Sequence, residues 1–554
     1  MTDAAEQELD VFIVGGGPVG LLSAIELTRR GIKVRVIERA ETHTPYSKAS
    51  VIHVRNQELL AATGIIDQIR AVGHPMHATA VNAFGKVIGE LNLQGVDSPF
   101  VGPWIIFQSE TEEILINHLA SLGVDVEWQK EFQSFEQQAD GVKVTIRDVD
   151  GHEEVVSAKW LLGCDGSGSQ VRDQAGIAYD GRKYDEEFQF QLADVDMTSS
   201  VPKDKGMIYM TKSGAFVLLV PQYDHERIIL TKPRDEPLDA STAGADAGIV
   251  HGTTREVLTL DELQTLTARY GPSDADIRDS RWLSRFRIHV RLAREYRANR
   301  VIIAGDAAHI HVPMGGQGMN TGFGDAVNLA WKLALVVKGR ADESLLNTYK
   351  PERRPVAKKI VESTDKMFIR ISKPSKPFIW AARNIAPLVF PKPKTQNRIR
   401  YNVAQFNIQY ENSTVVEDLR GRKHAGPIAG DRAPDAVLGG SGEGASTIFD
   451  AVLPEAWFSL VVFEGGGEVD LQALETAIAP YRDFVTPFVV AKPSATSNRP
   501  ESFRVLEDVS GDGHRRYGAE KSTIYLIRPD KYIGFCADAD GVDALRSHLG
   551  RILK

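Results

Sequence analysis

A glycine-rich turn that joins an apolar strand to a helix near the N-terminus constrains the fold of this chain more than any other feature. Residues 11–14 predict a buried strand, residues 18–30 a helix, and residues 33–37 a second strand. The turn at residues 15–20 reads Gly-Gly-Gly-Pro-Val-Gly, and Glu38 closes the second strand. This order of elements predicts a βαβ unit that binds a dinucleotide.

Three glycines of this turn have distinct expected roles. Gly15 permits the tight turn, Gly17 lets the backbone approach a pyrophosphate, and Gly20 lets the helix pack closely on the strand. The helix N-terminus supplies free N–H donors, and Glu38 would accept hydrogen bonds from the adenosine ribose. Glycine-rich turns also occur for packing alone, but the strand, the helix and the acid together favour the dinucleotide site.

A second strand-turn-helix pattern lies nearly three hundred residues further along the chain. Residues 301–304 predict a short apolar strand that ends at Gly305-Asp306, and the glycine-rich stretch 313–320 opens a predicted amphipathic helix. We expect Asp306 to accept hydrogen bonds from ribityl hydroxyls, and the helix from about Gly318 to stabilise the negative charge of a reduced flavin. Two such sites far apart suit one extended FAD better than a transient nicotinamide. A glycine-rich turn with a capping aspartate is the simpler alternative.

Metal and thiol chemistry find little support in the sequence. His309 and His311 are candidate metal ligands, but we find no carboxylate or cysteine arranged around them. We therefore expect both to be hydrogen-bonded histidines in a turn, with no metal bound. The two cysteines, Cys164 and Cys536, allow at most one disulfide. A reducing cytoplasm fits this composition best.

Composition places the chain among ordinary soluble globular proteins. Its 554 residues are 42% hydrophobic and 25% charged, and this length suits about two to four domains. The net charge is −9 and the basic residues are scattered, so we expect no nucleic-acid partner. Residues 1–10 lack the apolar core of a signal peptide. No run reaches the roughly 18 apolar residues of a membrane span, and the nearest candidate, 377–390, is interpreted as a partly buried helix.

Shifts in pattern along the chain divide it into five segments. Residues 1–184 and 289–371 carry the two glycine-rich sites, and 185–288 is strand-rich, which indicates an inserted sheet. Prolines and lysines accumulate in 372–425, which is interpreted as a linker with wrapping helices. Residues 426–554 alternate strand and helix patterns and predict a separate C-terminal unit.

Five motifs in order resemble those of the FAD-dependent aromatic hydroxylases, single-component flavoprotein monooxygenases with a para-hydroxybenzoate-hydroxylase-like fold. The resemblance covers most of the first 360 residues. Besides the two glycine-rich sites, it rests on three stretches: Gln108-Ser109-Glu110-Thr111-Glu112, residues 164–172 and residues 349–355. Residues 305–320 are similar to the phenol hydroxylase branch, and residues 430–435 and 526–530 to the thioredoxin-like extension of that branch.

The resemblance implies an α/β fold with three parts. These are a Rossmann-type FAD-binding domain, an inserted β-sheet substrate domain, and a C-terminal thioredoxin-like α/β domain that covers the first domain or forms a homodimer contact. Gln108 would contact the flavin, and Asp165-Gly166 would lie beside the cofactor, although helix capping and a simple turn are the respective alternatives. The full set of expected cofactor-binding residues is Gly15, Gly17, Pro18, Gly20, Glu38, Arg39, Lys48, Gln108, Asp165, Gly166, Asp306, Pro313, Gly316, Gly318, Met319 and Asn320.

Two positions depart from the family pattern. Lys48 stands where the family usually has an arginine, which keeps the charge but loses the bidentate fork. Ser50 aligns where the phenol hydroxylase branch has an acid and some chlorophenol hydroxylases have a histidine, so the proton-abstracting group is left unassigned. The candidates for the substrate pocket are Ser50, His53, Tyr209, Tyr223, Arg285, Arg287 and Pro313.

The resemblance also implies the reaction. NADPH or NADH reduces FAD, O2 adds at flavin C4a, and the hydroperoxide hydroxylates a phenolic or other electron-rich aromatic substrate in a site that excludes water. With no second glycine fingerprint, the nicotinamide is expected to visit briefly. A Baeyer–Villiger or epoxidising oxygenase of the same fold is the first alternative, and a non-catalytic flavin-binding redox sensor is a remote one.

Overall fold

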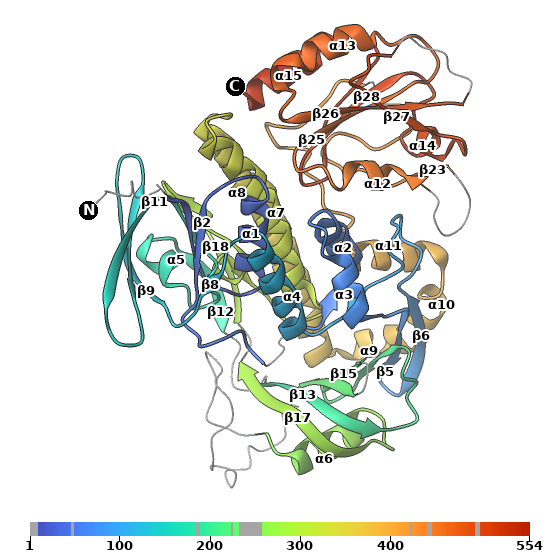
Figure 1. Cartoon of the computed structure of the whole chain (residues 1–554). Helices are drawn as coiled ribbons and strands as arrows, with labels where there is room; N and C mark the ends of the chain where they lie inside the picture. The colour runs from blue at the N-terminus through green and yellow to red at the C-terminus, as the bar shows by residue number, and fades with distance from the viewer. Residues whose placement is uncertain are drawn as a thin grey trace.

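The computed structural model describes most of the chain in three spatially distinct parts (Figure 1). The described residues are 9–45, 49–183, 189–222, 225–231, 258–287, 289–420, 424–439, 446–493 and 499–554. A sheet flanked by helices holds both glycine-rich sites, a second sheet lies against it, and the C-terminal unit packs on the opposite end of the long helix α7 (Gln317–Val337). No helix of the described residues is long and apolar enough to cross a bilayer.

The first sheet contains the predicted βαβ unit. Its path runs β19 (Arg297–Ala298), β20 (Val301–Ile303), β11 (Glu153–Gly163), β1 (Leu9–Val14), β2 (Val34–Ile37) and β8 (Val126–Glu127), and β10 (Val142–Arg147) and β9 (Glu131–Gln137) extend β11. Strands β20, β11, β1, β2 and β8 run parallel. The connection from β1 to β2 is α1 (Pro18–Thr28). This confirms the predicted strand, helix and strand, although the helix ends two residues earlier than expected.

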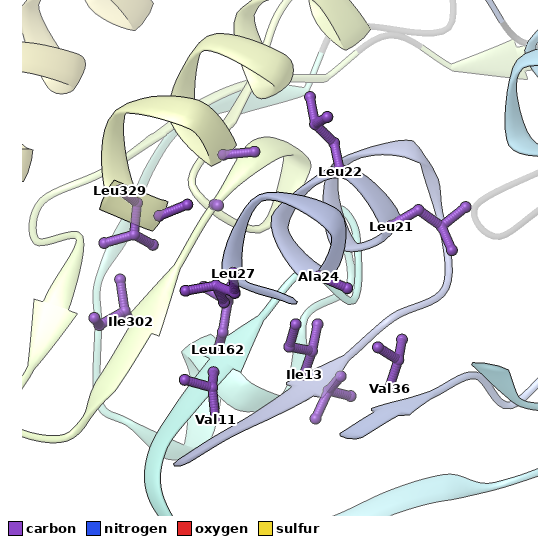
Figure 2. Packing of buried hydrophobic residues seen from close by; sticks show 14 of the residues in the cluster. Val11, Ile13, Leu21, Leu22, Ala24, Leu27, Val36, Leu162, Ile302 and Leu329 are labelled. Atoms are coloured by element: carbon purple, nitrogen blue, oxygen red, sulfur yellow. The ribbon is translucent and has the colours of Figure 1, made fainter. Parts of the chain in front are cut away.

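Burial on both faces explains why β1 is apolar throughout. Val11, Ile13 and Leu162 from the strands pack against Leu27 of α1 and Leu329 of α7 with their side chains almost fully buried (Figure 2). Strands of parallel sheets are covered by helices on both faces, which requires continuous rather than alternating apolar residues. The same packing fixes α1 and α7 side by side, with both N-termini near the carboxyl ends of the strands.

Shorter elements complete this part of the chain. The helices are α2 (Val54–Ala61), α3 (Ile66–Val72), α4 (Gln108–Ser121), α5 (Gln170–Gln174), α8 (Tyr349–Ser372) and the 3-10 turns η2 (Gly305–Ala307) and η3 (Glu343–Thr348). Two small sheets are formed by β3 (Val51–Ile52), β7 (Trp104–Ile105) and β4 (His74–Pro75), and by β12 (Tyr179–Lys183), β18 (His289–Ala293) and β21 (His309–Ile310).

The second sheet has seven strands and two different faces. Its order is β17 (Asp276–Arg287), β13 (Gln189–Thr198), β16 (Glu226–Thr231), β15 (Phe216–Pro221), β14 (Gly206–Met210), β5 (Ala78–Ala83) and β6 (Lys86–Asn92). One face is covered by α6 (Leu260–Tyr270). The other carries Phe190 and Phe216, which pack against Val312 and Met314 of the loop before α7. The sheet is assembled from two stretches of chain, since β5 and β6 precede the strand-rich range 185–288.

Three helices then wrap around the second sheet. They are α9 (Lys376–Asn384), α10 (Ala386–Val389) and α11 (Pro393–Val403), and all three contact β6. The range 377–390 is helical and partly buried, as predicted from its interrupted apolar pattern.

The C-terminal unit has a six-stranded mixed sheet between helices. The strand order is β22 (Glu417–Asp418), β29 (Ile533–Asp538), β28 (Thr523–Ile527), β25 (Phe458–Phe463), β26 (Val485–Ala491) and β27 (Arg504–Glu507). The remaining elements are β23 (Val437–Gly439), β24 (Ser446–Thr447), α12 (Ile448–Val452), α13 (Leu471–Ile478), η4 (Ala479–Tyr481), α14 (Asp512–Arg516) and α15 (Val542–Ile552). Trp331 and Leu335 of α7 belong to the same apolar core as Leu460, so this unit is docked on α7. Its thioredoxin-like character stays a prediction.

Candidate cofactor and substrate site

The first glycine-rich turn combines close packing with open space. Gly15 has a φ of +112°, and a Cβ there would lie 2.4 Å from the Cys164 carbonyl oxygen. A Cβ at Gly20 would lie 2.0 Å from the Gly15 carbonyl oxygen, whereas nothing lies within 4 Å of a Cβ at Gly17. The N-cap residue of α1 is Gly17, which has no side chain that could cap the helix. The turn therefore leaves open N–H donors where a pyrophosphate would bind.

Glu38 lies at the carboxyl end of β2, directly beside this turn. Its Oε2 accepts a hydrogen bond from the Gly16 N–H at 2.9 Å, and its Oε1 accepts one from the Ala40 N–H at 3.0 Å. The carboxylate is half-buried, and the neighbouring Arg39 is exposed. Glu38 thus occupies the position expected of the acid that accepts from a ribose.

The second glycine-rich segment forms a tight loop before α7. Gly315 and Gly316 have φ values of +75° and +64°. Gly316 is the N-cap residue of α7 and has no side chain that could cap the helix. Asn320 joins this loop to β3, since its Nδ2 donates to the Gly316 and Val51 carbonyls at 2.8 Å each. Its Oδ1 accepts from the His53 N–H at 2.8 Å. The uncapped start of α7 is therefore held rigidly, as an anion-stabilising helix N-terminus requires.

Two buried imidazoles flank this loop and are neutral. His53 Nε2 donates to the Gly315 carbonyl at 2.7 Å, and His311 Nδ1 donates to the Val312 carbonyl at 2.8 Å. Burial lowers the pKa of each to about 4. Within the described part of the chain, His53 Nδ1 and His311 Nε2 have no hydrogen-bond partner. Each ring therefore presents an acceptor nitrogen beside the loop.

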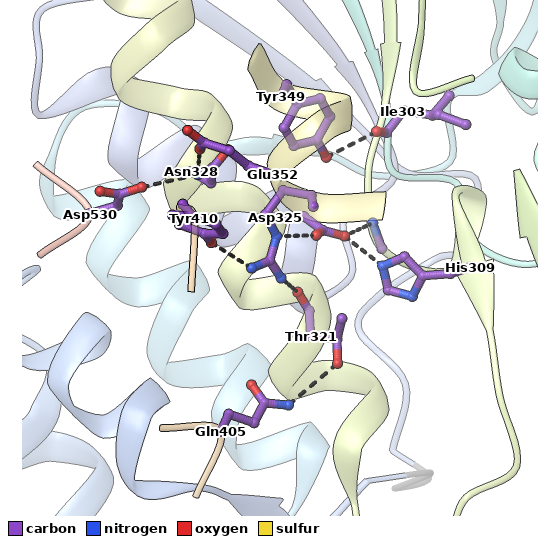
Figure 3. A network of polar contacts seen from close by, with 12 residues as sticks. Ile303, His309, Thr321, Asp325, Asn328, Tyr349, Glu352, Gln405, Tyr410 and Asp530 are labelled. Carbon is purple, nitrogen blue, oxygen red and sulfur yellow. Dashed lines mark hydrogen bonds and ion pairs between the residues drawn. The ribbon is translucent and has the colours of Figure 1, made fainter. Parts of the chain in front are cut away.

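A buried carboxylate that the sequence did not indicate organises the turn that follows β20 (Figure 3). Asp325 of α7 accepts hydrogen bonds from the Gly305 N–H at 3.2 Å, His309 Nε2 at 2.6 Å and Arg353 Nε at 2.8 Å. Arg353 also donates to Tyr410 Oη at 2.8 Å. The expectation that no carboxylate is arranged around His309 was wrong. Asp325 lies 16 residues further along the chain, but α7 brings it within hydrogen-bond distance of His309.

Asp306 lies at the end of β20 with an exposed side chain. Its backbone carbonyl accepts a hydrogen bond from Tyr179 Oη at 2.8 Å, which fixes the 3-10 turn. The carboxylate is thus at the same sheet edge as Glu38 and the two glycine-rich loops. Pro313, Gly318 and Met319 are half-buried in the loop and in the first turn of α7.

Gln108 and Asp165 make local contacts. Gln108 Oε1 accepts from the Ala49 N–H at 3.2 Å. Asp165 accepts from Ser169 Oγ at 2.5 Å and from the Val171 N–H at 3.1 Å, while Gly166 has a φ of +78°. The Asp165 contacts fit the simple turn considered as its alternative. Gln108 does not cap α4, because Phe107 is the N-cap residue and Glu110 accepts from its N–H at 3.0 Å. Lys48 lies outside the described residues.

The face of the second sheet that packs against the loop before α7 carries a buried ion pair. Arg227 of β16 donates to both oxygens of Asp194, from Nε at 2.8 Å and from Nη2 at 2.7 Å. Its guanidinium lies 5.2 Å from the ring centre of Phe107, which stacks on His225 at 5.0 Å. Arg227 Nη1 has no hydrogen-bond partner among the described residues. A charged residue directly before the apolar run Ile228-Ile229-Leu230 was the signal that could have identified Arg227.

The structure corrects two of the substrate-pocket candidates. Tyr209 packs in the apolar cluster under α6, and Arg285 pairs with Glu262 of α6, so both lie on the face of the sheet away from the loop. Ser50 is buried and its carbonyl accepts the Ile106 N–H at 3.2 Å. Tyr223 and the side chain of Arg287 lie outside the described residues.

The two cysteines are both free thiols with raised pKa values. Burial is the main cause for each, and nearby carboxylates add to it. A reactive thiol needs a lowered pKa, so this environment favours structural roles for Cys164 and Cys536.

Comparison with known proteins places this geometry in a family. The FAD binding domain family matches residues 8–364, which include both glycine-rich sites and α7. Pentachlorophenol 4-monooxygenase of Sphingobium chlorophenolicum is 31% identical, over 97% of this chain and 95% of that protein. The chain belongs to the FAD-dependent aromatic monooxygenases. It is therefore an oxidoreductase that binds FAD.

Other members of this monooxygenase family match over nearly the full length. A flavin-dependent monooxygenase of Mycobacteroides abscessus is 31% identical, over 96% of this chain and 98% of that protein. The structure of the anhydrotetracycline hydroxylase OxyS from Streptomyces rimosus superposes with a TM-score of 0.74 at 27% identity, covering 99% of both chains. The mixed α/β fold with several sheets is accordingly that of the aromatic hydroxylases.

Proposed function

We propose that this monooxygenase hydroxylates a phenolic or other electron-rich aromatic ring, with NAD(P)H and O2 as co-substrates. The observation that carries this proposal is the buried Arg227, whose Nη1 has no partner among the described residues. It lies on the sheet face that meets the loop before α7. A phenolic oxygen is a suitable acceptor for that group. FAD, when bound and reduced by NAD(P)H, would activate O2, and O2 would provide the oxygen atom.

We propose that the cofactor lies between the two glycine-rich sites. The open N–H donors of α1 would hold the pyrophosphate, Glu38 the adenosine ribose and Asp306 the ribityl chain. The uncapped N-terminus of α7 would lie at the isoalloxazine ring, where its partial positive charge favours the reduced, anionic state. The open space at Gly17 and the unpartnered nitrogens of His53 and His311 fit such a ligand.

The chain's own residues then position and activate the ring. Donation from Arg227 to the substrate oxygen would stabilise the phenolate, which makes the ring more nucleophilic. Asp194 keeps the guanidinium in one orientation through two hydrogen bonds. Phe190, Phe216 and Met314 surround this face with apolar side chains that exclude water. Arg227 stays protonated and only donates, so it would hold the phenolate but not take its proton. The base that the family pattern would place at Ser50 stays unassigned.

We retain the five-part division of the chain as a proposal, with one qualification. Residues 78–92 join the strands of 189–287 in the second sheet, and residues 417–418 join the C-terminal sheet. The division 1–184, 185–288, 289–371, 372–425 and 426–554 therefore describes the order along the chain better than the grouping in space.

The reaction is tested by the rate of flavin reduction. We expect a phenolic substrate to accelerate reduction by NADPH or NADH well beyond the substrate-free rate, and the product to carry one added hydroxyl. Anaerobic stopped-flow absorbance and mass spectrometry of the product measure the two quantities. Insertion of oxygen next to a ketone would assign Baeyer–Villiger chemistry instead, and equal reduction rates with and without every phenol would contradict the proposal.

The cofactor assignment predicts weaker FAD binding when either carboxylate is removed. Glu38→Ala and Asp306→Ala should each weaken binding by roughly ten- to a hundred-fold, since a charge-assisted hydrogen bond contributes about 1.5–3 kcal/mol. Fluorescence titration of the apoprotein with FAD measures the dissociation constant. Glu113→Ala, which removes an exposed carboxylate of α4, should leave it unchanged. Full flavin occupancy of both variants at dilute protein would overturn the assignment.

Arg227 is tested against a matched arginine on the other face of the same sheet. Arg227→Met should lower kcat/KM for the phenol by roughly ten- to a hundred-fold, because one charge-assisted hydrogen bond to the substrate is lost. Arg285→Met removes a buried guanidinium that pairs with Glu262 of α6. We expect that control to retain kcat/KM within about two-fold. Equal losses in both variants would mean that the sheet, rather than a substrate contact, was affected.

A further inference from the structure

The stretch of residues 366–410, which includes α9, α10 and α11, differs in charge from the rest of the chain. Residues 366–410 contain no aspartate or glutamate, whereas the whole chain carries a net charge of −9. The nine basic residues in these 45 positions are Lys366, Arg370, Lys373, Lys376, Arg383, Lys392, Lys394, Arg398 and Arg400. Basic residues are therefore concentrated in this stretch, although they are scattered over the rest of the chain.

Large apolar side chains are exposed in the middle of this basic segment. Trp380 is 60% exposed, Ile385 45%, Leu388 71% and Val389 39%. They fall within ten residues, on α9, α10 and their junction, and both helices lie beside β6 (Figure 1). A single exposed apolar residue is ordinary, but a contiguous group that includes tryptophan marks an interaction surface.

The opposite face of the two helices is firmly anchored. Phe378 packs edge-to-face on Phe84 with ring centres 5.8 Å apart, and Arg383 Nη1 donates to the Phe84 carbonyl at 2.7 Å. Phe390 belongs to the same apolar cluster as Ile88 of β6. The exposed residues are therefore presented on a fixed support, and no described part of the chain covers them.

We propose that this surface, which comprises α9, α10 and the basic residues around them, binds an anionic lipid bilayer. Trp380, Ile385, Leu388 and Val389 enter the interfacial region, while the exposed Lys376, Lys392, Lys394 and Arg398 contact lipid headgroups. Surface-bound amphipathic helices combine these features: an apolar face with tryptophan or leucine, and lysine or arginine on the polar face. The helices lie on the bilayer and do not cross it.

A bilayer fits the charge pattern better than a second copy of the chain. Most dimers are isologous, so a contact centred on α9 and α10 would place the same basic segment of each copy face to face. Repulsion between like charges would oppose that contact. Glu90 of β6, which lies nearby, is already paired with Lys205 at 2.7 Å.

The surface lies next to the proposed substrate face. Ile208 and Met210 of β14 contact both the apolar cluster under α9 and the cluster that contains Phe216 and Met314. Under the proposed function, bilayer binding would place the substrate face next to a membrane, in which apolar aromatic compounds concentrate. The binding itself does not depend on that function and is measured without substrate or NAD(P)H.

Cosedimentation of the full-length, FAD-loaded protein with vesicles tests the proposal. We expect binding to vesicles of phosphatidylcholine with about one third phosphatidylglycerol, little binding to phosphatidylcholine alone, and strong weakening at about 0.5 M salt. Changing Lys376, Lys392 and Lys394 to Gln should weaken binding about a hundred-fold, since each basic residue near such a surface contributes about five-fold. Trp380→Ser with Leu388→Ser should weaken it by about ten-fold or more.

Two control variants match these changes elsewhere on the surface. Val149→Ser with Val155→Ser removes valines that are 67% and 62% exposed, and replacing the exposed Lys33, Lys143 and Lys521 with Gln removes three charges. Both controls should bind within a few-fold of the parent, and melting temperature and FAD content verify folding of all variants. Absence of binding to the anionic vesicles, or equal weakening by test and control variants, would overturn the proposal. A concentration-dependent dimer that the Trp380 and Leu388 changes abolish would assign the surface to a second copy instead.

Discussion

Replacing Arg528 with Leu is expected to lower the free energy of unfolding by about 3–5 kcal/mol. The Arg528 side chain is fully buried and donates twice to Glu352 of α8, at 2.8 Å each, and twice to Asp530, at 3.0 and 2.6 Å. Removing the guanidinium leaves two buried carboxylates with Lys332 Nζ, 2.7 Å from Glu352, as the nearest cation. Chemical denaturation of the FAD-loaded protein measures the loss.

Two further variants separate charge from geometry at this position. Arg528→Lys keeps the charge but loses the bidentate fork, so its loss should be intermediate. Arg551→Leu breaks the ion pair with Glu417, but Arg551 is 54% exposed, and exposed pairs contribute only about 0–1 kcal/mol. If Arg528→Leu loses no more than the Arg551 variant, the buried cluster does not hold the C-terminal unit on α8.

Replacing Asp325 with Leu is expected to weaken both folding and FAD binding. Arg353 would lose its buried carboxylate partner, which costs about 3–5 kcal/mol. The Gly305 N–H and His309 would lose their acceptor, so the 3-10 turn that carries Asp306 would be held less firmly, although the Tyr179 hydrogen bond stays. We therefore expect FAD affinity to fall about ten-fold or more. Denaturation and FAD titration measure the two effects.

The pH dependence of the Asp325 effect has a defined sign. Burial alone would raise the pKa of this carboxyl, but the neighbouring His309 and Arg353 lower it below its usual value. The stabilisation is therefore fully present above the unfolded value of about 3.9 and is lost as the pH falls through the folded pKa. The stability difference between parent and Asp325→Leu should be constant near neutral pH and shrink in acid.

A matched control is Asp543→Leu, since that side chain is 95% exposed and its partner Arg546 lies 3.4 Å away. It should change the unfolding free energy by less than about 1 kcal/mol at every pH. Unchanged FAD affinity in the Asp325 variant would show that the turn at Gly305 does not need this anchor.

Local signals were sufficient to predict the two glycine-rich turns and the strands and helices beside them. The strand, turn and helix of residues 9–28 and the loop before α7 depend on glycines, apolar runs and helix starts that act over a few residues. Glu38 follows its strand directly, so its position beside Gly16 follows from the βαβ geometry. The identity of the family also came from these short motifs, because they carry most of the contacts expected with the cofactor.

The sequence by itself therefore determined the element types, the glycine-rich turns and the class of chemistry, because each depends on neighbouring residues. Only the tertiary structure decided which distant residues meet: Asp325 with His309 and Arg353, Arg227 with Phe107, and β5 and β6 with the strands of 189–287. The tertiary structure also decided that Tyr209 and Arg285 lie on the face of the second sheet that α6 covers. Which face a strand residue lies on depends on the elements that pack against each face of the sheet. Such pairings are set by the packing of whole layers, and no local pattern in one stretch of chain encodes its partner in another.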